Sequence, residues 1–140
     1  MKSHLTLDGG VTAPGGFRAA GVSCGIKRAN PSITAALLDL ALVVAEGPVS
    51  AAAVFTTNRA VAAPVVVSRE HLRRSGGQAR AIVINSGCAN ACTGEAGMRV
   101  ALDMAAAVAS ALGCNAEHVL VASTGVIGVE LDITKVRTGV

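Results

Sequence analysis

Residues suited to chemistry follow an apolar run near the C-terminal end of the sequence. Residues 119–128 read Val-Leu-Val-Ala-Ser-Thr-Gly-Val-Ile-Gly, so we expect a strand that ends in a Ser-Thr-Gly turn. Gly125 has no Cβ, and a carbonyl oxygen can therefore approach its N–H closely, with the Thr124 hydroxyl as a second donor. Donors aimed at developing negative charge form an oxyanion hole, which predicts acyl-transfer chemistry. The alternative is a strand-to-helix turn whose glycines serve only the geometry.

A second polar segment lies in the middle of the chain. Residues 84–94 read Ile-Asn-Ser-Gly-Cys-Ala-Asn-Ala-Cys-Thr-Gly, which predicts a strand end, a polar loop over residues 85–90 and a helix start. A helix N-terminus can bind an anion, but the Gly-Lys-Ser/Thr core of a phosphate-binding loop is missing. We therefore favour a loop that is satisfied by its own Asn side chains, with Thr93 as a helix cap.

The cysteines and histidines predict neither a metal site nor a catalytic triad. Cys88 and Cys92 have no histidine nearby, which disfavours zinc. The 4 cysteines form no Cys-x-x-Cys pair, so we expect free thiols in a reducing cytoplasm. The histidines stand in polar contexts and are expected on the solvated surface; they are His4, His71 and His118.

The composition excludes several classes of partner. Among 140 residues, 12 Lys and Arg stand against 9 Asp and Glu, and this net charge of +3 provides no basic face for nucleic acid. Phe17 and Phe55 are the only aromatic residues, too few for a base-stacking platform. The apolar runs fall far short of the roughly 18 residues that a membrane-spanning helix needs, and we expect no signal peptide. A single cytoplasmic domain over residues 1–140 is the expectation.

The order of apolar runs and turn residues predicts a mixed α/β (α+β) fold rather than a regular doubly wound sheet, because several strands precede the long helix. Strands are expected at residues 17–26, 37–45, 50–55, 61–67, 79–84 and 119–122, with a turn over residues 27–34. Helices are expected at residues 69–75, from Thr93 or Gly94 to Leu112, and from Ile133 onward, with one short turn after Asn115. The expected caps are Ser68, Thr93, Asn115 and Asp132. The last helix is cut short by the end of the sequence, which suggests a partial chain.

Several segments together resemble the ArgJ family of bifunctional ornithine acetyltransferases. Each segment is weak evidence alone, but they occur in the family's order and cover almost the whole chain. They match the N-terminal, α-chain portion of that family. The segments are Val-Thr-Ala-Pro-Gly-Gly-Phe-Arg-Ala-Ala-Gly (11–21), Gly-Ile-Lys (25–27), Asp-Leu-Ala-Leu (39–42), Val-Phe-Thr-Thr-Asn (54–58), Ala-Ala-Pro-Val (62–65), Asn-Ser-Gly (85–87), Ala-Asn-Ala-Cys-Thr-Gly (89–94) and Ser-Thr-Gly-Val-Ile-Gly (123–128).

The resemblance implies an N-terminal-nucleophile type of fold, of the ArgJ/DmpA kind, that is completed by a second chain. Members cleave themselves before a threonine, and this new N-terminus of the β chain attacks N2-acetylornithine and passes the acetyl group to glutamate. The implied assembly is of α2β2 type. The family's oxyanion pair falls on Thr124 and Gly125, whereas the nucleophile lies beyond Val140. Residues 1–140 alone are therefore expected to be inactive.

Some questions stay open at this level. The resemblance implies no bound cofactor or metal, but some members also use acetyl-CoA as an acetyl donor. The rival interpretations are a non-catalytic remnant of the same fold that binds a partner, and a free-standing amino-acid-binding module. Hydrophobic residues make up 51% of the chain against 15% charged residues, so we expect an apolar surface that a β chain covers.

Overall fold

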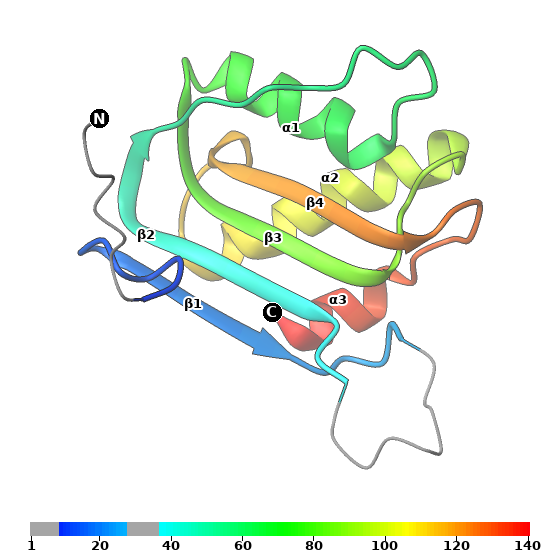
Figure 1. Cartoon of the computed structure of the whole chain (residues 1–140), viewed down its shortest axis with the longest axis horizontal. Helices are drawn as coiled ribbons and strands as arrows, with labels where there is room; N and C mark the ends of the chain where they lie inside the picture. Colours follow the sequence, from blue (N-terminus) through cyan, green and yellow to red (C-terminus); the bar gives the residue numbers. More distant parts are fainter. Residues whose placement is uncertain (1–8, 28–36) are drawn as a thin grey trace, which may run out of the picture.

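A mixed sheet of four strands, with helices on one of its faces, forms the domain (Figure 1). The computed structural model describes residues 9–27 and 37–140. The strand order is β1-β2-β3-β4; β1, β2 and β3 are antiparallel neighbours, and β4 runs parallel to β3. The elements are β1 (Phe17–Val22), β2 (Leu40–Ser50), α1 (Ala63–Arg74), β3 (Gln78–Cys88), α2 (Gly94–Leu112), a 3₁₀ turn (Ala116–His118), β4 (Val119–Val126) and α3 (Ile133–Gly139). The predicted mixed α/β fold is confirmed.

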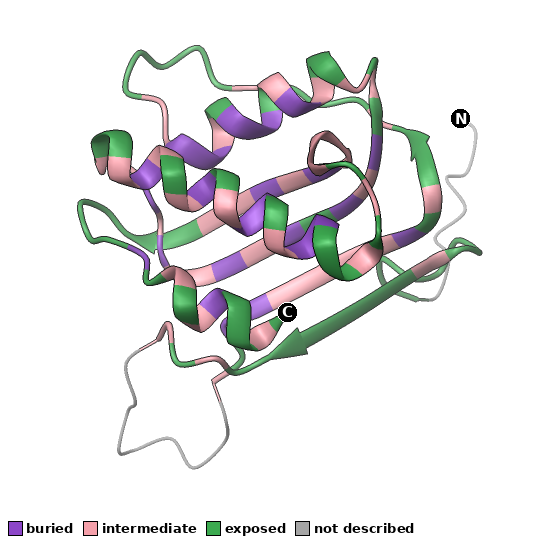
Figure 2. Ribbon diagram, turned by 180° about the vertical axis from the view of Figure 1, so that it is seen from behind, coloured by how far each residue is buried: buried purple, intermediate pink, exposed green. Residues whose placement is uncertain are grey.

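The hydrophobic core lies between β3, β4 and the helices, and small side chains build it. Ala81 and Val83 of β3 alternate with more exposed neighbours, as expected of a strand with one buried face. Opposite them, α2 contributes a buried stripe that includes Ala101, Met104 and Val108. Figure 2 looks onto this helix-covered face, and Figure 1 onto the other side of the sheet. On that other side Ile82 is 39% exposed.

Helix α2 and helix α3 agree with the sequence prediction. Gly94–Leu112 follows Thr93 and ends before Gly113, and Arg80 Nη1 donates a hydrogen bond of 2.9 Å to the Leu112 carbonyl at the helix end. Helix α3 begins at Ile133, and the Asp132 carboxylate accepts from the Thr134 N–H at 2.9 Å, as a cap does. Across residues 9–27 and 37–140, none of the helices combines the length and apolarity needed to cross a bilayer.

The predicted strand at residues 61–67 is wrong, because residues 63–67 form the first part of α1. The Val-rich run suggested a strand, but Pro64 stands in the first helical turn, where a missing N–H costs nothing. Ser68 therefore lies inside the helix and does not cap it. Its Oγ accepts from the Val121 N–H at 2.8 Å and donates to the Val121 carbonyl at 2.7 Å. In this way α1 covers the edge of β4.

The strands differ from prediction mainly at their ends. The predicted strand at 50–55 is wrong: β2 runs through to Ser50, with a register shift between Val44 and Val49, and regular structure then stops until α1. The strand expected from residue 37 begins at Leu40, and the one expected over 17–26 ends at Val22. Asn85–Cys88 continue β3 rather than starting a loop, and Ser123–Gly125 continue β4 rather than turning. The turn predicted at 27–34 lies outside the described residues beyond Lys27.

The Ser68 contact gives a stability prediction. Ser68→Ala leaves the N–H and carbonyl of Val121 without their partner, so we expect a loss of about 1–3 kcal/mol in the free energy of unfolding. Denaturant unfolding of the variant and the parent protein measures this. Ser110→Ala, at an exposed serine of α2, is the matched control and should change little. Equal stability of the Ser68 and Ser110 variants would show that water replaces the Ser68 hydroxyl.

Candidate functional site

The ends of β3 and β4 meet through their main chains at two glycines. In the parallel register, Ser86, Gly87 and Cys88 face Thr124, Gly125 and Val126 in turn. Both glycines have positive φ, +117° at Gly87 and +133° at Gly125, which other residues rarely adopt. A Cβ on Gly125 would lie 2.3 Å from the Gly87 carbonyl carbon and 2.5 Å from the Cys88 nitrogen. Only glycine therefore allows the strands this close approach.

The main-chain direction along β4 shows where the Gly125 N–H points. In a strand, alternate residues direct their N–H and C=O groups to opposite edges. The Val119 carbonyl and both main-chain groups of Val121 face α1, whereas the Val126 carbonyl accepts from Ala89 N–H on the β3 side. Gly125 lies an even number of residues from Val119 and Val121, so its main-chain groups point to the same edge of the strand as theirs. Its N–H is therefore directed to the free edge of β4, and the residue is exposed.

The Thr124 side chain belongs to the other open surface, the face of the sheet that the helices leave uncovered. Cross-strand neighbours share a face, and Thr124 pairs with Ser86, in the same row as Ile82 and Ile84. Thr124 is itself exposed. The Thr124 side chain and the Gly125 N–H therefore lie on the two sides of one corner, the first on the uncovered face and the second at the free edge of β4.

Two buried polar side chains, Asn85 and Asp39, hold the main chain on either side of Gly87 in place. Asn85 is fully buried, and its Nδ2 donates 2.8 Å to the carbonyl of Cys88. Asp39 is 2% exposed, and its carboxylate accepts from the N–H groups of Cys24 at 2.7 Å and Lys27 at 2.9 Å. This fixes residues 24–27 over Gly87, where an added Cβ would lie 3.1 Å from Lys27 Cγ. The sequence analysis predicted a buried hydrogen-bonding role for neither residue, although the acidic Asp39 within an apolar run was a usable signal.

The pKa values of Asp39 and Cys24 are shifted in opposite directions. Burial raises the pKa of Asp39, but the N–H groups of Cys24 and Lys27 favour the carboxylate more strongly, so this pKa lies below its ordinary 3.8. The Cys24 thiol donates to Asp39 at 3.3 Å. Burial, and then the neighbouring carboxylate, raise the pKa of Cys24 to about 11. Cys24 is therefore a protonated donor and not a nucleophile.

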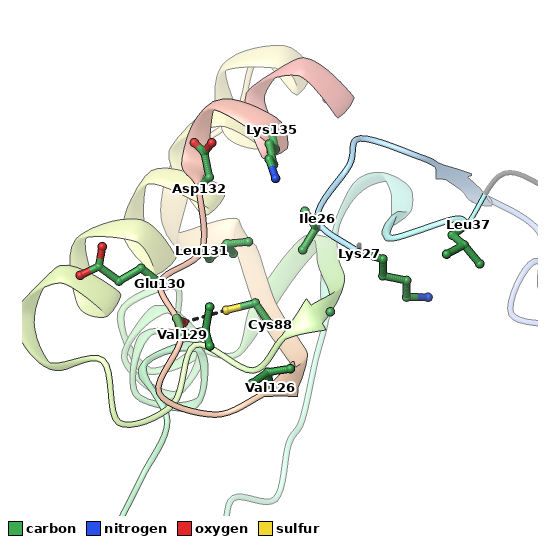
Figure 3. Close-up of a pocket in the computed structure, with 11 residues that line it drawn as sticks. Ile26, Lys27, Leu37, Cys88, Val126, Val129, Glu130, Leu131, Asp132 and Lys135 are labelled. Carbon is green, nitrogen blue, oxygen red and sulfur yellow. Dashed lines mark hydrogen bonds between the residues drawn. The ribbon is translucent and has the colours of Figure 1, made fainter. Parts of the chain in front are cut away.

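A pocket of about 710 Å³ opens beside the strand ends (Figure 3). Gly87, Cys88 and Val126 form one wall, and neither Thr124 nor Gly125 lines it. The Cys88 thiol points at the Val129 carbonyl, 3.0 Å away. The other lining residues come from before β2, from the segment that leads into α3 and from α3 itself; they are Ile26, Lys27, Leu37, Val129, Glu130, Leu131, Asp132 and Lys135.

The loop before α2 satisfies its own polar groups, as the sequence predicted. Asn90 is fully buried; its Nδ2 donates 2.9 Å to the Gly97 carbonyl, and its Oδ1 accepts from the Thr93 hydroxyl at 2.7 Å. Thr93 holds the cap position, but its side chain makes this bond and no capping bond. Asn90 and Cys92 both have positive φ. The loop is a rigid connection, and its hydrogen bonds leave the anion-binding alternative without support.

The remaining sequence candidates do not join the corner. The prediction of a solvated His71 is wrong: its ring is 5% exposed, and Nδ1 lies 2.8 Å from the Val119 carbonyl. His118 is half-buried, and His4 lies outside the described residues. All four cysteines are free thiols, as predicted. Among the residues that the structure describes, no group of three or more Cys, His, Asp or Glu side chains could hold a metal ion.

Comparison with known proteins decides the family. The ArgJ family model matches residues 18–140. The chain belongs to the ArgJ family. Two curated members named "Arginine biosynthesis bifunctional protein ArgJ" illustrate the likeness. The one from Gloeobacter violaceus is 53% identical over 138 residues, 99% of this chain and 32% of its own length. The one from Dehalococcoides mccartyi is 46% identical over 142 residues, 100% of this chain and 34% of its own length.

Solved ArgJ structures share the fold. The crystal structure of the Bacillus halodurans protein gives a TM-score of 0.84 at 40% identity, covering 94% of this chain and 64% of that one. Ornithine acetyltransferase from Mycobacterium tuberculosis, solved with ornithine, gives 0.81 at 49% identity, covering 93% of this chain and 66% of that one. The chain spans about a third of the length of the curated ArgJ relatives quoted above.

Asp39 gives a prediction for pH. Its folded pKa lies below the ordinary 3.8, so its stabilising contribution is complete at pH 7 and is lost as the pH falls through 3.8 and below. Asp39→Asn should therefore melt below the parent protein at pH 7, and this gap should narrow between pH 5 and pH 3. Melting temperatures at these three pH values measure it. Asp103→Asn, at an exposed carboxylate, controls for the lost charge at pH 7. A gap that stays constant with pH contradicts the role assigned to the carboxylate.

Proposed function

We propose that this chain is the N-terminal, α-chain part of a glutamate N-acetyltransferase of arginine biosynthesis. The complete enzyme moves the acetyl group from N2-acetylornithine to glutamate through an acetyl-threonine intermediate. The ArgJ match over residues 18–140 carries this proposal. The name ornithine acetyltransferase, borne by a structure of 49% identity, supports the choice of substrates. The site of action is the cytoplasm, where free thiols stay reduced.

The role of this chain in that reaction is to supply the oxyanion hole. When a threonine hydroxyl attacks the acetyl carbonyl, the carbonyl oxygen becomes an oxyanion. The Thr124 hydroxyl and the Gly125 N–H donate to it at the corner of the sheet. Both are exposed there, and the main chain behind Gly125 is held by its contact with Gly87. Donors that are already oriented stabilise such an oxygen more than mobile water does.

The acetyl transfer balances without a cofactor. In the first half, a new ester C–O bond forms at the threonine, the amide C–N bond breaks, and the leaving amine of ornithine takes a proton. In the second half, the amine of glutamate attacks the ester, an amide forms, and the threonine hydroxyl is restored. The same corner serves both halves, because each passes through a tetrahedral intermediate with one charged oxygen. Acetyl-CoA as a second acetyl donor would enter at the first half.

The β chain of the same precursor, which carries the nucleophilic threonine, is the proposed partner. It lies on the uncovered face of the sheet in an α2β2-type assembly. The described helices leave this face bare (Figure 1). Aliphatic side chains such as Ile82 are exposed on it. Thr124 projects from the same face, so a chain seated there brings its nucleophile to the oxyanion corner. Relatives about three times as long as this chain contain the residues for such a partner.

The oxyanion role gives a kinetic prediction for the complete, processed enzyme. Thr124→Ala removes one donor, so kcat should fall roughly a hundred- to a thousandfold. KM should change much less, because the hydrogen bond strengthens only as charge develops. Steady-state kinetics of acetyl transfer from N2-acetylornithine to glutamate measure both. Processing is checked first, since self-cleavage passes through a similar oxyanion.

Thr124→Ser is the matched control, because it keeps the hydroxyl at the same position. It should retain most of the activity. A folded, processed Thr124→Ala enzyme within about threefold of the parent, far from the loss expected for a missing donor, would return Thr124 to a purely geometric role.

The uncovered face gives a prediction for assembly. Ile82→Lys puts a charge at the centre of the proposed interface, so the β chain should no longer co-purify, because a buried unpaired charge is costly. Val54 is 99% exposed and lies outside the sheet, so Val54→Lys should leave co-purification intact. Tagged pull-down followed by size-exclusion chromatography compares the two variants. If the Ile82 variant retains its partner, the interface lies elsewhere.

A further inference from the structure

Asn85 is the most deeply buried polar side chain next to the oxyanion corner. It is 0% exposed, and its Nδ2 reaches the Cys88 carbonyl three residues along its own strand, at 2.8 Å. In the β3–β4 register it faces Ser123, the residue before Thr124. Two main-chain contacts with β4 follow in the same segment: a Cβ on Gly125 would lie 2.3 Å from the Gly87 carbonyl carbon and 2.5 Å from the Cys88 nitrogen.

The last residues of β3 need this bond because they have lost one strand neighbour. β2 begins at Leu40, which pairs with Asn85, and the Asp39 carbonyl takes the N–H of Ser86. Cys88 lies past that end, and its carbonyl is bound by the Asn85 side chain. The peptide units of Gly87 and Cys88 are thereby fixed between Asn85 on one side and Gly125 on the other.

The chemistry of Asn85 fits an orienting role better than a purely stabilising one. Within the described chain, Asn85 Oδ1 and the Ser123 Oγ are buried and have no hydrogen-bond partner. A buried oxygen without a partner costs stability, which an aliphatic side chain at this position would avoid. A short side chain with an N–H donor is nevertheless required to reach the Cys88 carbonyl. Asparagine provides that donor, whereas an ionised aspartate cannot.

We infer that Asn85 is a positioning residue for the Gly125 N–H, acting through the Gly87–Cys88 main chain that Gly125 contacts. The inference rests on the proposed oxyanion role of Thr124 and Gly125. Asn85 itself touches neither the substrate nor the reacting atoms. Its hydrogen bond to the Cys88 carbonyl fixes the Gly87–Cys88 main chain, which Gly125 contacts. The orientation of the Gly125 N–H toward the free edge of β4 depends on this bond.

The test is made in the complete, processed enzyme with Asn85→Asp and Asn85→Ala. Asn85→Asp keeps the shape of the side chain but replaces its N–H donor with a carboxylate oxygen, which cannot donate to the Cys88 carbonyl. We expect kcat to fall at least about tenfold, less than the hundredfold or more that follows outright loss of a donor. KM should stay within about twofold, because the ground state does not depend on this hydrogen bond. Lowering the pH should shrink the kcat deficit of Asn85→Asp, since a protonated carboxyl donates again, and not that of Asn85→Ala.

Asn90→Asp is the matched control. Asn90 is equally buried, and its Nδ2 also donates to a carbonyl, that of Gly97 at 2.9 Å. This variant should lose thermal stability but keep its kcat, with no deficit that depends on pH. If Asn90→Asp and Asn85→Asp lower kcat equally, the effect is general destabilisation and the inference is wrong.

Thr124→Ala, assayed alongside, separates this inference from the proposed function. If Thr124→Ala lowers kcat but folded Asn85→Ala stays within about threefold of the parent, well short of the effect of a missing donor, only the positioning role is overturned. If Thr124→Ala is also without effect, the oxyanion hole itself is rejected. Should neither Asn85 variant accumulate as folded enzyme, Asn85 is a residue of the fold, and the positioning role is again overturned.

Discussion

The main-chain contact between Gly87 of β3 and Gly125 of β4 is the constraint on which the rest of the site depends. It brings the two strands so close that Gly125 has no room for a side chain, whereas a Cβ on Gly87 would crowd Ile26 and Lys27. Both glycines have positive φ. The elements around it hold this contact in place: Asp39 secures residues 24–27 against Gly87, and Asn85 secures Cys88. An exposed pair of donors is thus built on a rigid, buried support.

The sheet has one face that the helices cover and one face that they leave uncovered. The helices bury one face of the sheet with small side chains, which gives the domain its core. The opposite face keeps exposed aliphatic side chains and carries Thr124 at its border. The donors therefore stand where the proposed partner must arrive, and a nucleophile from another chain needs no path through the core. Membership of the ArgJ family, whose quoted curated members are about three times as long, agrees with this arrangement.

Local sequence signals predicted the parts of the fold that local interactions determine. Helix α2, bounded by Thr93 and Gly113, and the Asp132 cap of α3 were read correctly. The Val-rich run at residues 61–67 was misread because tertiary packing along β4 selects the helix there. Thr124 and Gly125 were recognised by type, but their place inside a strand depends on pairing with residues almost forty positions away, which no local pattern contains. The burial of Asn85 was missed for the same reason, whereas Asp39 stands out within its apolar run by residue type alone.

The way α1 covers β4 has a consequence for how the sheet can grow. The hydroxyl of Ser68 both donates to and accepts from Val121, and His71 binds the Val119 carbonyl, so these side chains take the place of a neighbouring strand's main chain. A new strand cannot pair with β4 at these positions. In the described part of the sheet, a new strand could therefore pair over a full strand length only with β1, whose outer edge has no neighbour in residues 9–27 and 37–140. The edge of β4 is thus protected against uncontrolled strand addition at Val119 and Val121, and an ordered enlargement of the sheet starts from the opposite edge.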